Sequence, residues 1–290
     1  MLCFSALVAG SFALGGMTAN LVPPAAINAL RFLLATVLIG SVLAATGKLD
    51  RAGFRAPWRY LIVGGLFAIY FVLMFEGLKT APPVSAAAVF TLMPVMSAGA
   101  GWVLLRQITT PRMAVALAIG GTGAVWVIFK ADLSALLAFE VGRGEAIYFV
   151  GCIAHAFFTP MMRRLNRGES APLFAFGSIT ACAGILTVYG ASDLLAVDWA
   201  ALPGIFWITV VYLAVAATAL SFVCVQYATL RLPSAKVMAY SYLTPAWVIL
   251  WEIALGHGGP TSLVLIGIAL ACVALLLLLK DQERLPVSSA

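Results

Sequence analysis

Charged residues are scarce in this sequence. It holds 17 Lys and Arg and 11 Asp and Glu in 290 residues, while 63% of the chain is apolar. An ordinary soluble domain carries about 25% charged residues. Folding leaves about a quarter of the unfolded chain's surface exposed, so a soluble protein of this length needs a polar surface that these residues cannot supply. The composition therefore excludes a soluble globular domain and predicts an integral membrane protein.

Cysteine motifs are also missing, and we expect no cleavable leader. The five cysteines are scattered through apolar runs, with no CxxC pair and no histidine at metal-ligand spacing. This pattern favours cysteines that serve as small apolar helix residues. We accordingly expect no metal, no cofactor and no catalytic residue. The N-terminus is apolar without a basic region before it, so we interpret it as a spanning helix rather than a signal peptide.

Long apolar runs, by contrast, fill the chain. A helix that crosses a bilayer needs about 20 apolar residues. Cutting the sequence at its charged and Pro/Gly clusters gives ten such runs, at residues 2–20, 24–46, 58–78, 84–105, 113–129, 146–162, 172–189, 205–229, 235–255 and 262–279. The runs are continuously apolar rather than alternating, which disfavours a β-barrel. The predicted fold is an all-α integral membrane protein with ten transmembrane helices.

The cations are unevenly divided between the two sides of the predicted bundle. Cations are enriched in cytoplasmic loops. With a cytoplasmic N-terminus, thirteen lie inside: Lys48, Arg51, Arg55, Arg59, Arg106, Arg112, Arg163, Arg164, Arg167, Arg231, Lys236, Lys280 and Arg284. Four lie outside or within a helix: Arg31, Lys79, Lys130 and Arg143. We expect both termini in the cytoplasm and a location in a bacterial inner membrane. The positive charge is then an orientation signal, and no nucleic-acid partner is expected.

The sequence repeats itself at an offset of 151 residues. The segment FEGLKTAPPVSAAAVFTLMP, which ends at Pro94, aligns without gaps to QYATLRLPSAKVMAYSYLTP, which ends at Pro245. Small residues recur at the same offset in the fifth and tenth runs, where they allow close helix packing. Each repeat contains five spans, at 1–137 and 138–290, and an odd number inverts the second repeat in the membrane. Inverted repeats around a midplane site are typical of secondary transporters.

The two repeated prolines lie about eleven residues into their helices, near the middle of the bilayer. A proline inside a helix leaves the carbonyl four residues earlier unbonded, here those of Phe90 and Ser241, and kinks the helix. Lipid does not tolerate free carbonyls, whereas a polar cavity does. We expect Pro94 and Pro245 to mark a central cavity, although kinks that serve packing alone would show the same sequence.

These features together resemble a known family. Ten spans in two inverted repeats, the Arg31-Phe32 pair and the proline-kinked helices are similar to the EamA domain of the drug/metabolite transporter superfamily. The stretch TALSFVCVQYATLRLPSAKVMAYSYLTPAW resembles the second repeat most closely, and the similarity covers the whole chain. Members move amino acids, metabolites, nucleotide sugars and drugs. The exporters of aromatic and neutral amino acids are the most similar branch.

The resemblance also implies cavity residues. Tyr70 falls where those exporters have a cavity tyrosine. Thr91 and Met93 replace an aromatic pair just before the kink, and His155 replaces a tryptophan found in many members, so only Tyr70 keeps the chemistry. The predicted substrate site comprises these residues, the two residues with freed carbonyls and two deep aromatics: Tyr70, Phe90, Thr91, Met93, His155, Phe158, Ser241 and Tyr242.

Ionisable side chains at membrane depth are few and costly. His155 is level with both prolines, either as a cavity residue or as a neutral imidazole bonded to one neighbouring helix. Arg31 and Glu76 lie in the outer third of antiparallel neighbouring helices. We expect them to form a structural ion pair rather than to bind substrate.

The expected function is alternating-access transport of a small amphiphilic molecule across the lipid bilayer, most specifically amino acid export, by a monomer. Sparse membrane carboxylates favour a facilitator over a proton antiporter. Carriage of another metabolite or a drug is the alternative. A membrane-embedded enzyme would need a nucleophile with a base or clustered carboxylates, and a channel would need charge rings or exposed carbonyls; neither pattern is evident.

Overall fold

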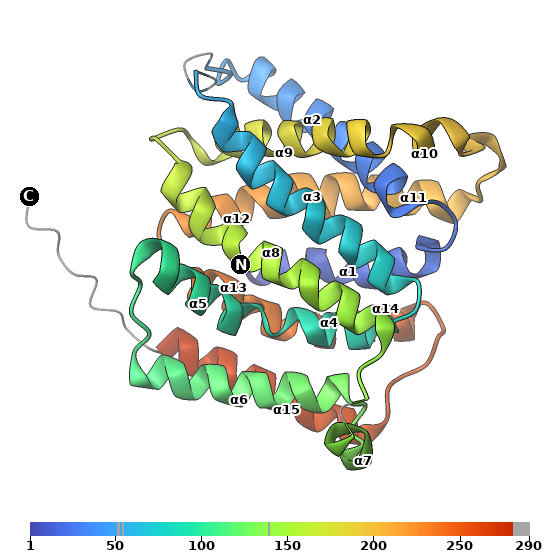
Figure 1. The fold of residues 1–290 in the computed structure, drawn as a ribbon, viewed down its shortest axis with the longest axis vertical. Helices are drawn as coiled ribbons and strands as arrows, with labels where there is room; N and C mark the ends of the chain where they lie inside the picture. Colours follow the sequence, from blue (N-terminus) through green and yellow to red (C-terminus); the bar gives the residue numbers. More distant parts are fainter. Residues whose placement is uncertain (51–52, 54, 139, 281–290) are drawn as a thin grey trace, which may run out of the picture.

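The computed structural model describes residues 1–50, 53, 55–138 and 140–280 as a bundle of helices, and no strand occurs in this part of the chain (Figure 1). The α-helices are α1 (Leu2–Thr18), α2 (Pro24–Ala45), α3 (Trp58–Leu78), α4 (Pro83–Phe90), α5 (Met93–Leu105), α6 (Pro111–Ile128), α7 (Leu133–Leu137), α8 (Arg143–Leu165), α9 (Ala171–Tyr189), α10 (Ala191–Ala196), α11 (Gly204–Ala214), α12 (Ser221–Thr229), α13 (Ser234–Ala239), α14 (Thr244–Ala254) and α15 (Ser262–Lys280). Short helical segments of other types are η2 (Trp199–Ala201), η3 (Val215–Leu220) and η4 (Tyr240–Leu243). The predicted all-α membrane fold is confirmed.

Every predicted span coincides with helical segments. Among the described residues, eight helical stretches are long and apolar enough to cross a membrane when α4 is taken with α5 and α11 with α12. The shorter apolar helix α1 and the interrupted segment α13–η4–α14 account for the other two predicted spans. Several of these helices begin with a proline, as at Pro24, Pro83 and Pro111. A proline fits there because N–H groups in the first turn have no acceptor within the helix, so the missing N–H costs nothing.

Three of the spans are not regular α-helices. Pro94 cannot donate to the carbonyl of Phe90, and the chain turns between α4 and α5 instead. There the N–H of Thr91 bonds to the carbonyls of Ala87 and Ala88 at 3.2 and 3.0 Å, and its hydroxyl bonds to the latter at 2.6 Å. The second repeat has its interruption at η4, directly before Pro245.

The third irregular span, between α11 and α12, contains the π-helical segment η3, where a continuous α-helix was predicted. No proline or glycine marks it in the sequence. A π-turn loosens the regular i→i−4 pattern and is frequent at functional sites.

Helix α3 is central in the packing. It lies against α2, α8 and α9, while α6 and α15 form a close pair at the edge of the bundle (Figure 1). That pair touches through glycines: a Cβ on Gly123 would lie 2.5 Å from the carbonyl oxygen of Gly267. The small residues noted in the sequence thus permit direct backbone contact.

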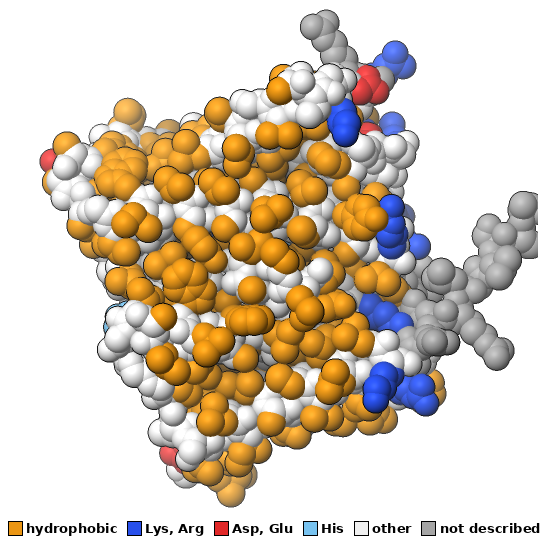
Figure 2. Space-filling view, turned by 180° about the vertical axis from the view of Figure 1, so that it is seen from behind, with side chains coloured by type: hydrophobic (Ala, Val, Ile, Leu, Met, Phe, Trp, Pro, Cys, Tyr) orange, Lys and Arg blue, Asp and Glu red, His pale blue; other side chains and the backbone are white. Residues whose placement is uncertain are grey.

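The surface divides into an apolar belt and a basic rim. Large apolar side chains such as Val37, Leu61 and Ile208 are 66%, 53% and 62% exposed. Figure 2 shows hydrophobic side chains covering one broad face, with Lys and Arg gathered along one edge. This distribution is the one expected for a protein surrounded by lipid, with most of its cations near one membrane surface.

Candidate substrate site

Aromatic side chains from three helices meet in the middle of the bundle. Tyr70 of α3 lies 4.3 Å, between ring centroids, from His155 of α8, and Phe90 of α4 is stacked 6.0 Å from the same imidazole. Phe158 of α8 stacks on Phe67 of α3 at 4.5 Å with an interplanar angle of 11°. Such ring pairs contribute about 0.5–1.5 kcal/mol beyond burial of their area. The cluster joins both halves of the chain.

Helical spacing explains the convergence. Tyr70 and Phe71 lie three and four residues after Phe67, and Met74 lies four and three residues after them, so all four share one face of α3. His155 and Phe158 share a face of α8 in the same way. Because α3 and α8 pack against each other, these two faces form an aromatic layer between them.

A small cavity of about 30 Å³ lies beside this layer. Its lining residues are Phe4, Val8, Ser11, Phe67, Tyr70, Phe71, Met74, Phe90, His155, Phe158, Ala217, Ser221, Phe222 and Val225. A volume of that size accommodates about one or two waters. The structure thus has a central cavity that is contracted around its aromatic walls.

Polar groups reach the aromatic layer at a few points. The hydroxyls of Tyr70 and Tyr148 are 2.8 Å apart and both residues are buried. His155 Nδ1 and Ser11 Oγ are buried without a hydrogen-bond partner. Unpaired buried polar atoms are costly, and a ligand or water that enters the cavity would satisfy them.

Tyr148 was not among the residues predicted for the site from the sequence. The available signal was its spacing: Tyr148 lies seven residues, two helical turns, before His155 and therefore on the same face of α8.

Four predicted site residues line the cavity and four do not. Tyr70, Phe90, His155 and Phe158 are in its wall. Thr91 and Met93 are buried at the break between α4 and α5. The Thr91 hydroxyl already donates a hydrogen bond to the Ala88 carbonyl of α4.

The other two, Ser241 and Tyr242, are buried in η4. Tyr242 points away from the cavity, because its ring packs against Gly120 of α6 in a separate apolar cluster with α15. The sequence placed Ser241 and Tyr242 close to Pro245, but it could not show toward which neighbouring helix their side chains point.

The predicted ion pair between Arg31 and Glu76 does not form. Glu76 pairs with Lys79, one helical turn further along α3, at 2.7 Å and partly in solvent. Arg31 is completely buried and turns toward η3, where its Nε donates to Thr218 Oγ1 at 2.5 Å and its Nη2 to the Ala217 carbonyl at 3.1 Å. The π-segment, which the sequence did not reveal, supplies these acceptors and draws the guanidinium away from Glu76.

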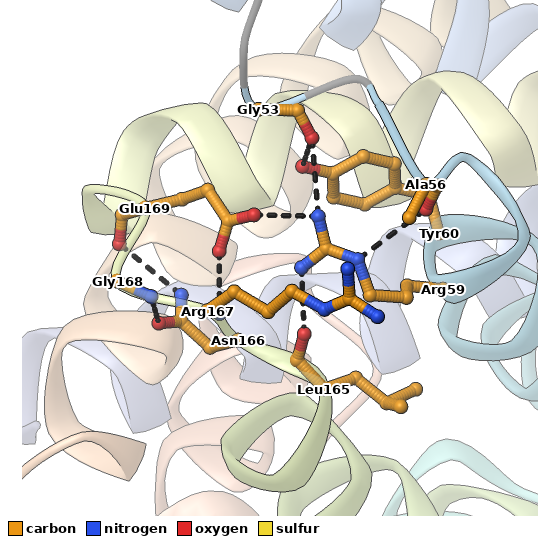
Figure 3. A network of polar contacts seen from close by, with 9 residues as sticks. All are labelled: Gly53, Ala56, Arg59, Tyr60, Leu165, Asn166, Arg167, Gly168 and Glu169. Atoms are coloured by element: carbon orange, nitrogen blue, oxygen red, sulfur yellow. Dashed lines mark hydrogen bonds and ion pairs between the residues drawn. The ribbon is translucent and has the colours of Figure 1, made fainter.

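A second buried arginine organises the rim at which the predicted inner loops lie. Arg59, at the start of α3, forms an ion pair with Glu169 at 2.6 Å (Figure 3). The same guanidinium donates to the carbonyls of Gly53, Ala56 and Leu165, at 3.1, 3.3 and 2.7 Å. It therefore ties the chain before α3 to the loop between α8 and α9.

The carboxylate of that pair also accepts a hydrogen bond from the backbone of its own loop. Glu169 accepts a hydrogen bond from the N–H of Arg167 at 2.6 Å. Burial by itself would raise the pKa of Glu169, but the hydrogen bonds from Arg59 and from this N–H outweigh it, and the pKa lies below its usual range. Glu169 is therefore charged at neutral pH. From the sequence, Arg59 was expected only to be one of the cations on the inner side.

At the opposite end of the bundle, Glu252 and His257 are 3.1 Å apart beside a surface recess of about 490 Å³ that also includes Lys79. Among the described residues, no three His, Cys, Asp or Glu side chains are grouped so that they could hold a metal ion.

Comparison with known proteins places these features in a family. The model of the EamA-like transporter family matches residues 1–129 and 142–280. Over 175 residues the chain is 25% identical to the uncharacterized transporter YyaM of Bacillus subtilis (strain 168); the match covers 60% of this chain and 57% of that protein, little more than half its length. One protein of known crystal structure shares the fold, with a TM-score of 0.73 and 21% identity over 95% of this chain and 94% of the other. The chain is a multi-pass membrane protein, and it belongs to the EamA-like transporter family of the drug/metabolite transporter superfamily.

Proposed function

We propose that this transporter is a secondary carrier that exports amino acids with aromatic or neutral side chains by alternating access. The observation that carries the proposal is the central cavity, whose walls combine stacked rings with the Tyr70 hydroxyl and an unpaired imidazole nitrogen on His155. Apolar walls with a few fixed polar groups suit a small amphiphilic ligand. Within the site, Tyr70, Phe90, His155 and Phe158 contact the substrate.

The alternating-access mechanism rests on an inverted repeat of residues 1–137 and 138–290. Two observations support it. The interruptions at Thr91–Leu92 and at Tyr242–Leu243 are 151 residues apart, the offset found in the sequence. The family model also matches the chain twice, once in each half. The interrupted spans, at Pro94 and Pro245, serve as the hinges at which one half rocks against the other.

Transport requires the cavity to widen, because its volume of about 30 Å³ is too small for an amino acid. Thr91, Met93 and Ser241 lie at the interruptions, and in this proposal they reach the substrate once the cavity opens. The Arg59–Glu169 pair then acts as a latch at one end of the pathway. It must loosen if the cavity opens toward that end.

Export as the direction of transport rests on the resemblance to the amino acid exporters, and we further propose that both termini lie in the cytoplasm of a bacterial cell. The basic rim supports this orientation, as do the cations counted in the sequence, of which Arg51 and Arg284 lie outside the described residues. We propose a monomeric facilitator without catalysis or cofactor. Strict coupling of substrate movement to a proton flux in reconstituted vesicles would contradict the facilitator.

The second candidate is a carrier of another metabolite or a drug. It is favoured by the presence of Thr91, Met93 and His155 where aromatic residues were expected, because these residues would leave the opened site less specific for aromatic side chains.

Counterflow in proteoliposomes distinguishes the candidates. Vesicles loaded with each of a panel of amino acids should accumulate the labelled form of the same compound, and the variant His155→Ala should lower the initial rate about tenfold. Thr122→Ala, on an exposed position of α6, is the matched control and should leave the rate unchanged. Accumulation of sugars or drugs, and of no amino acid, would replace amino acid export by the second candidate.

A further inference from the structure

Arg31 is a buried cation at the depth of the central cavity. It lies seven residues after Pro24 at the start of α2, and Tyr70 lies eight residues before Leu78 at the end of α3. These two ends are on the same side of the bundle, so at 1.5 Å per residue both side chains start about 11–12 Å below it. The exposed fraction of Arg31 is 0%.

Among the residues that the structure describes, no acid neutralises this guanidinium. Its two acceptors, the Thr218 hydroxyl and the Ala217 carbonyl, are uncharged, and its Nη1 has no partner. Within the part of the chain that the structure describes, no carboxylate oxygen lies within 4.0 Å of it. Burial of an uncompensated charge costs several kcal/mol, and such residues inside a membrane are rare and usually functional.

The guanidinium lies one side chain behind the cavity wall. Its Cζ is 3.9 Å from the ring centroid of Phe71, and both Phe71 and Ala217 line the cavity. The cavity must widen to admit an amino acid, and displacement of the Phe71 ring would both widen it and uncover the guanidinium. Movement of this one ring would therefore couple opening of the cavity to exposure of the charge.

We propose that Arg31 binds the carboxylate of the transported molecule, and that Thr218 and Ala217 hold the guanidinium while the cavity is contracted. This inference rests on the central site of the proposed function. A guanidinium receives a carboxylate through two parallel hydrogen bonds, and the unpaired Nη1 is available for one of them. The ligand class is a small molecule with an apolar or aromatic body and a free carboxylate.

Exchange of partners also links binding to motion. When the guanidinium bonds to the ligand it releases η3, the irregular segment between α11 and α12. Occupancy of the site then frees the span that Arg31 otherwise fixes to α2. A purely structural role for Arg31 would give no preference for one ligand group over another, and this difference makes the proposal testable.

The experiment compares matched ligand pairs on the purified full-length protein: phenylalanine with phenylalaninamide, and leucine with leucinamide. Affinity is taken from ligand-induced thermal stabilisation, and counterflow of the same compounds is measured separately. Loss of a charged hydrogen-bonded contact of about 2 kcal/mol corresponds to about 30-fold in affinity. The acid should therefore bind about 30-fold more tightly than its amide.

Three variants isolate the contact. In Arg31→Gln the acid-to-amide ratio should fall to about one, and in Arg31→Lys, which keeps the charge, it should remain above one. Thr218→Val removes only the partner of the contracted state, so it should keep the full ratio. The comparison on the unaltered protein needs no variant and stands even if Arg31→Gln does not fold.

The outcomes separate this inference from the function on which it rests. If the unaltered protein binds and carries amides as well as acids, or if Arg31→Gln keeps the preference for acids, Arg31 does not bind the carboxylate, while the proposed carrier stands. If neither member of any pair binds or exchanges, amino acids are not the substrate and both proposals fail.

Discussion

Removal of Arg59 should destabilise the protein more than any other single change at the basic rim. The variant Arg59→Met keeps the apolar part of the side chain and deletes its guanidinium. Arg59 as a whole is only 2% exposed, so the deleted group is buried. Three buried or half-buried carbonyls then lose a donor, and Glu169 loses its counter-ion. Removing one partner of a buried pair costs about 3–5 kcal/mol, and partial access of water at the rim favours the lower end.

Glu169→Gln is the milder counterpart. The amide oxygen can still accept from Arg59, but the amide nitrogen cannot accept from the N–H of Arg167, so one hydrogen bond is weakened and the other is lost. A hydrogen bond to a charged group contributes about 1.5–3 kcal/mol and a neutral one about 1 kcal/mol, so the expected cost is about 2 kcal/mol. The double variant should cost less than the sum of the two single changes, because both remove the same interaction.

The assay uses the protein's own thiols. Cys152 and Cys182 are fully buried, so a thiol-reactive dye reports unfolding in detergent. The midpoint should fall in the order unaltered protein, Glu169→Gln, Arg59→Met. Gly184→Ala, where a methyl group meets nothing within 4 Å, serves as control. Equal midpoints for Arg59→Met and the control would show that the latch contributes no stability and would refute the reasoning.

The same pair predicts an acid sensitivity. Because the pKa of Glu169 is lowered in the folded protein, the stabilisation is present above the pKa of the unfolded carboxyl, about 4.3. It is lost as the pH falls through the lower folded value. The destabilisation caused by Glu169→Gln should therefore be constant near neutrality and should shrink below about pH 4. An effect that grew on acidification would have the wrong sign.

Three further predictions concern the helices themselves. Tyr70→Phe removes the hydroxyl that meets Tyr148 and should cost about 1 kcal/mol in unfolding free energy; an unchanged thermal midpoint would contradict the contact. Gly123→Leu forces a side chain against the Gly267 backbone and should cost about 3 kcal/mol or more in unfolding free energy through overpacking. Its thermal midpoint should therefore lie far below that of Gly184→Ala, or the variant should fail to accumulate in membranes. Pro94→Ala restores the missing donor to the Phe90 carbonyl and straightens the interruption; thermal stability should be kept while counterflow slows several-fold, and an unchanged rate would show that this break is not a hinge.

The sequence by itself determined the features that depend on composition and on the local chain. Apolar runs fixed where each span lies, because every residue in lipid must satisfy its backbone within its own helix. Pro94 and Pro245 located two interruptions, since the loss of an N–H acts within one helical turn. Tyr70 was proposed from the resemblance to a known family, and His155 from that resemblance and from its depth in the membrane, level with both prolines.

Only the tertiary structure decided which groups meet across helices. Arg31 bonds to Thr218, 187 residues away, and this choice depends on a π-segment that no local signal in α11 or α12 marks. Arg59 finds Glu169 across 110 residues, and Tyr242 turns toward Gly120 instead of the cavity. Helical periodicity gives the face on which a side chain lies, but its partner is set by the rotation and height of the neighbouring helix, which depend on the packing of the whole bundle.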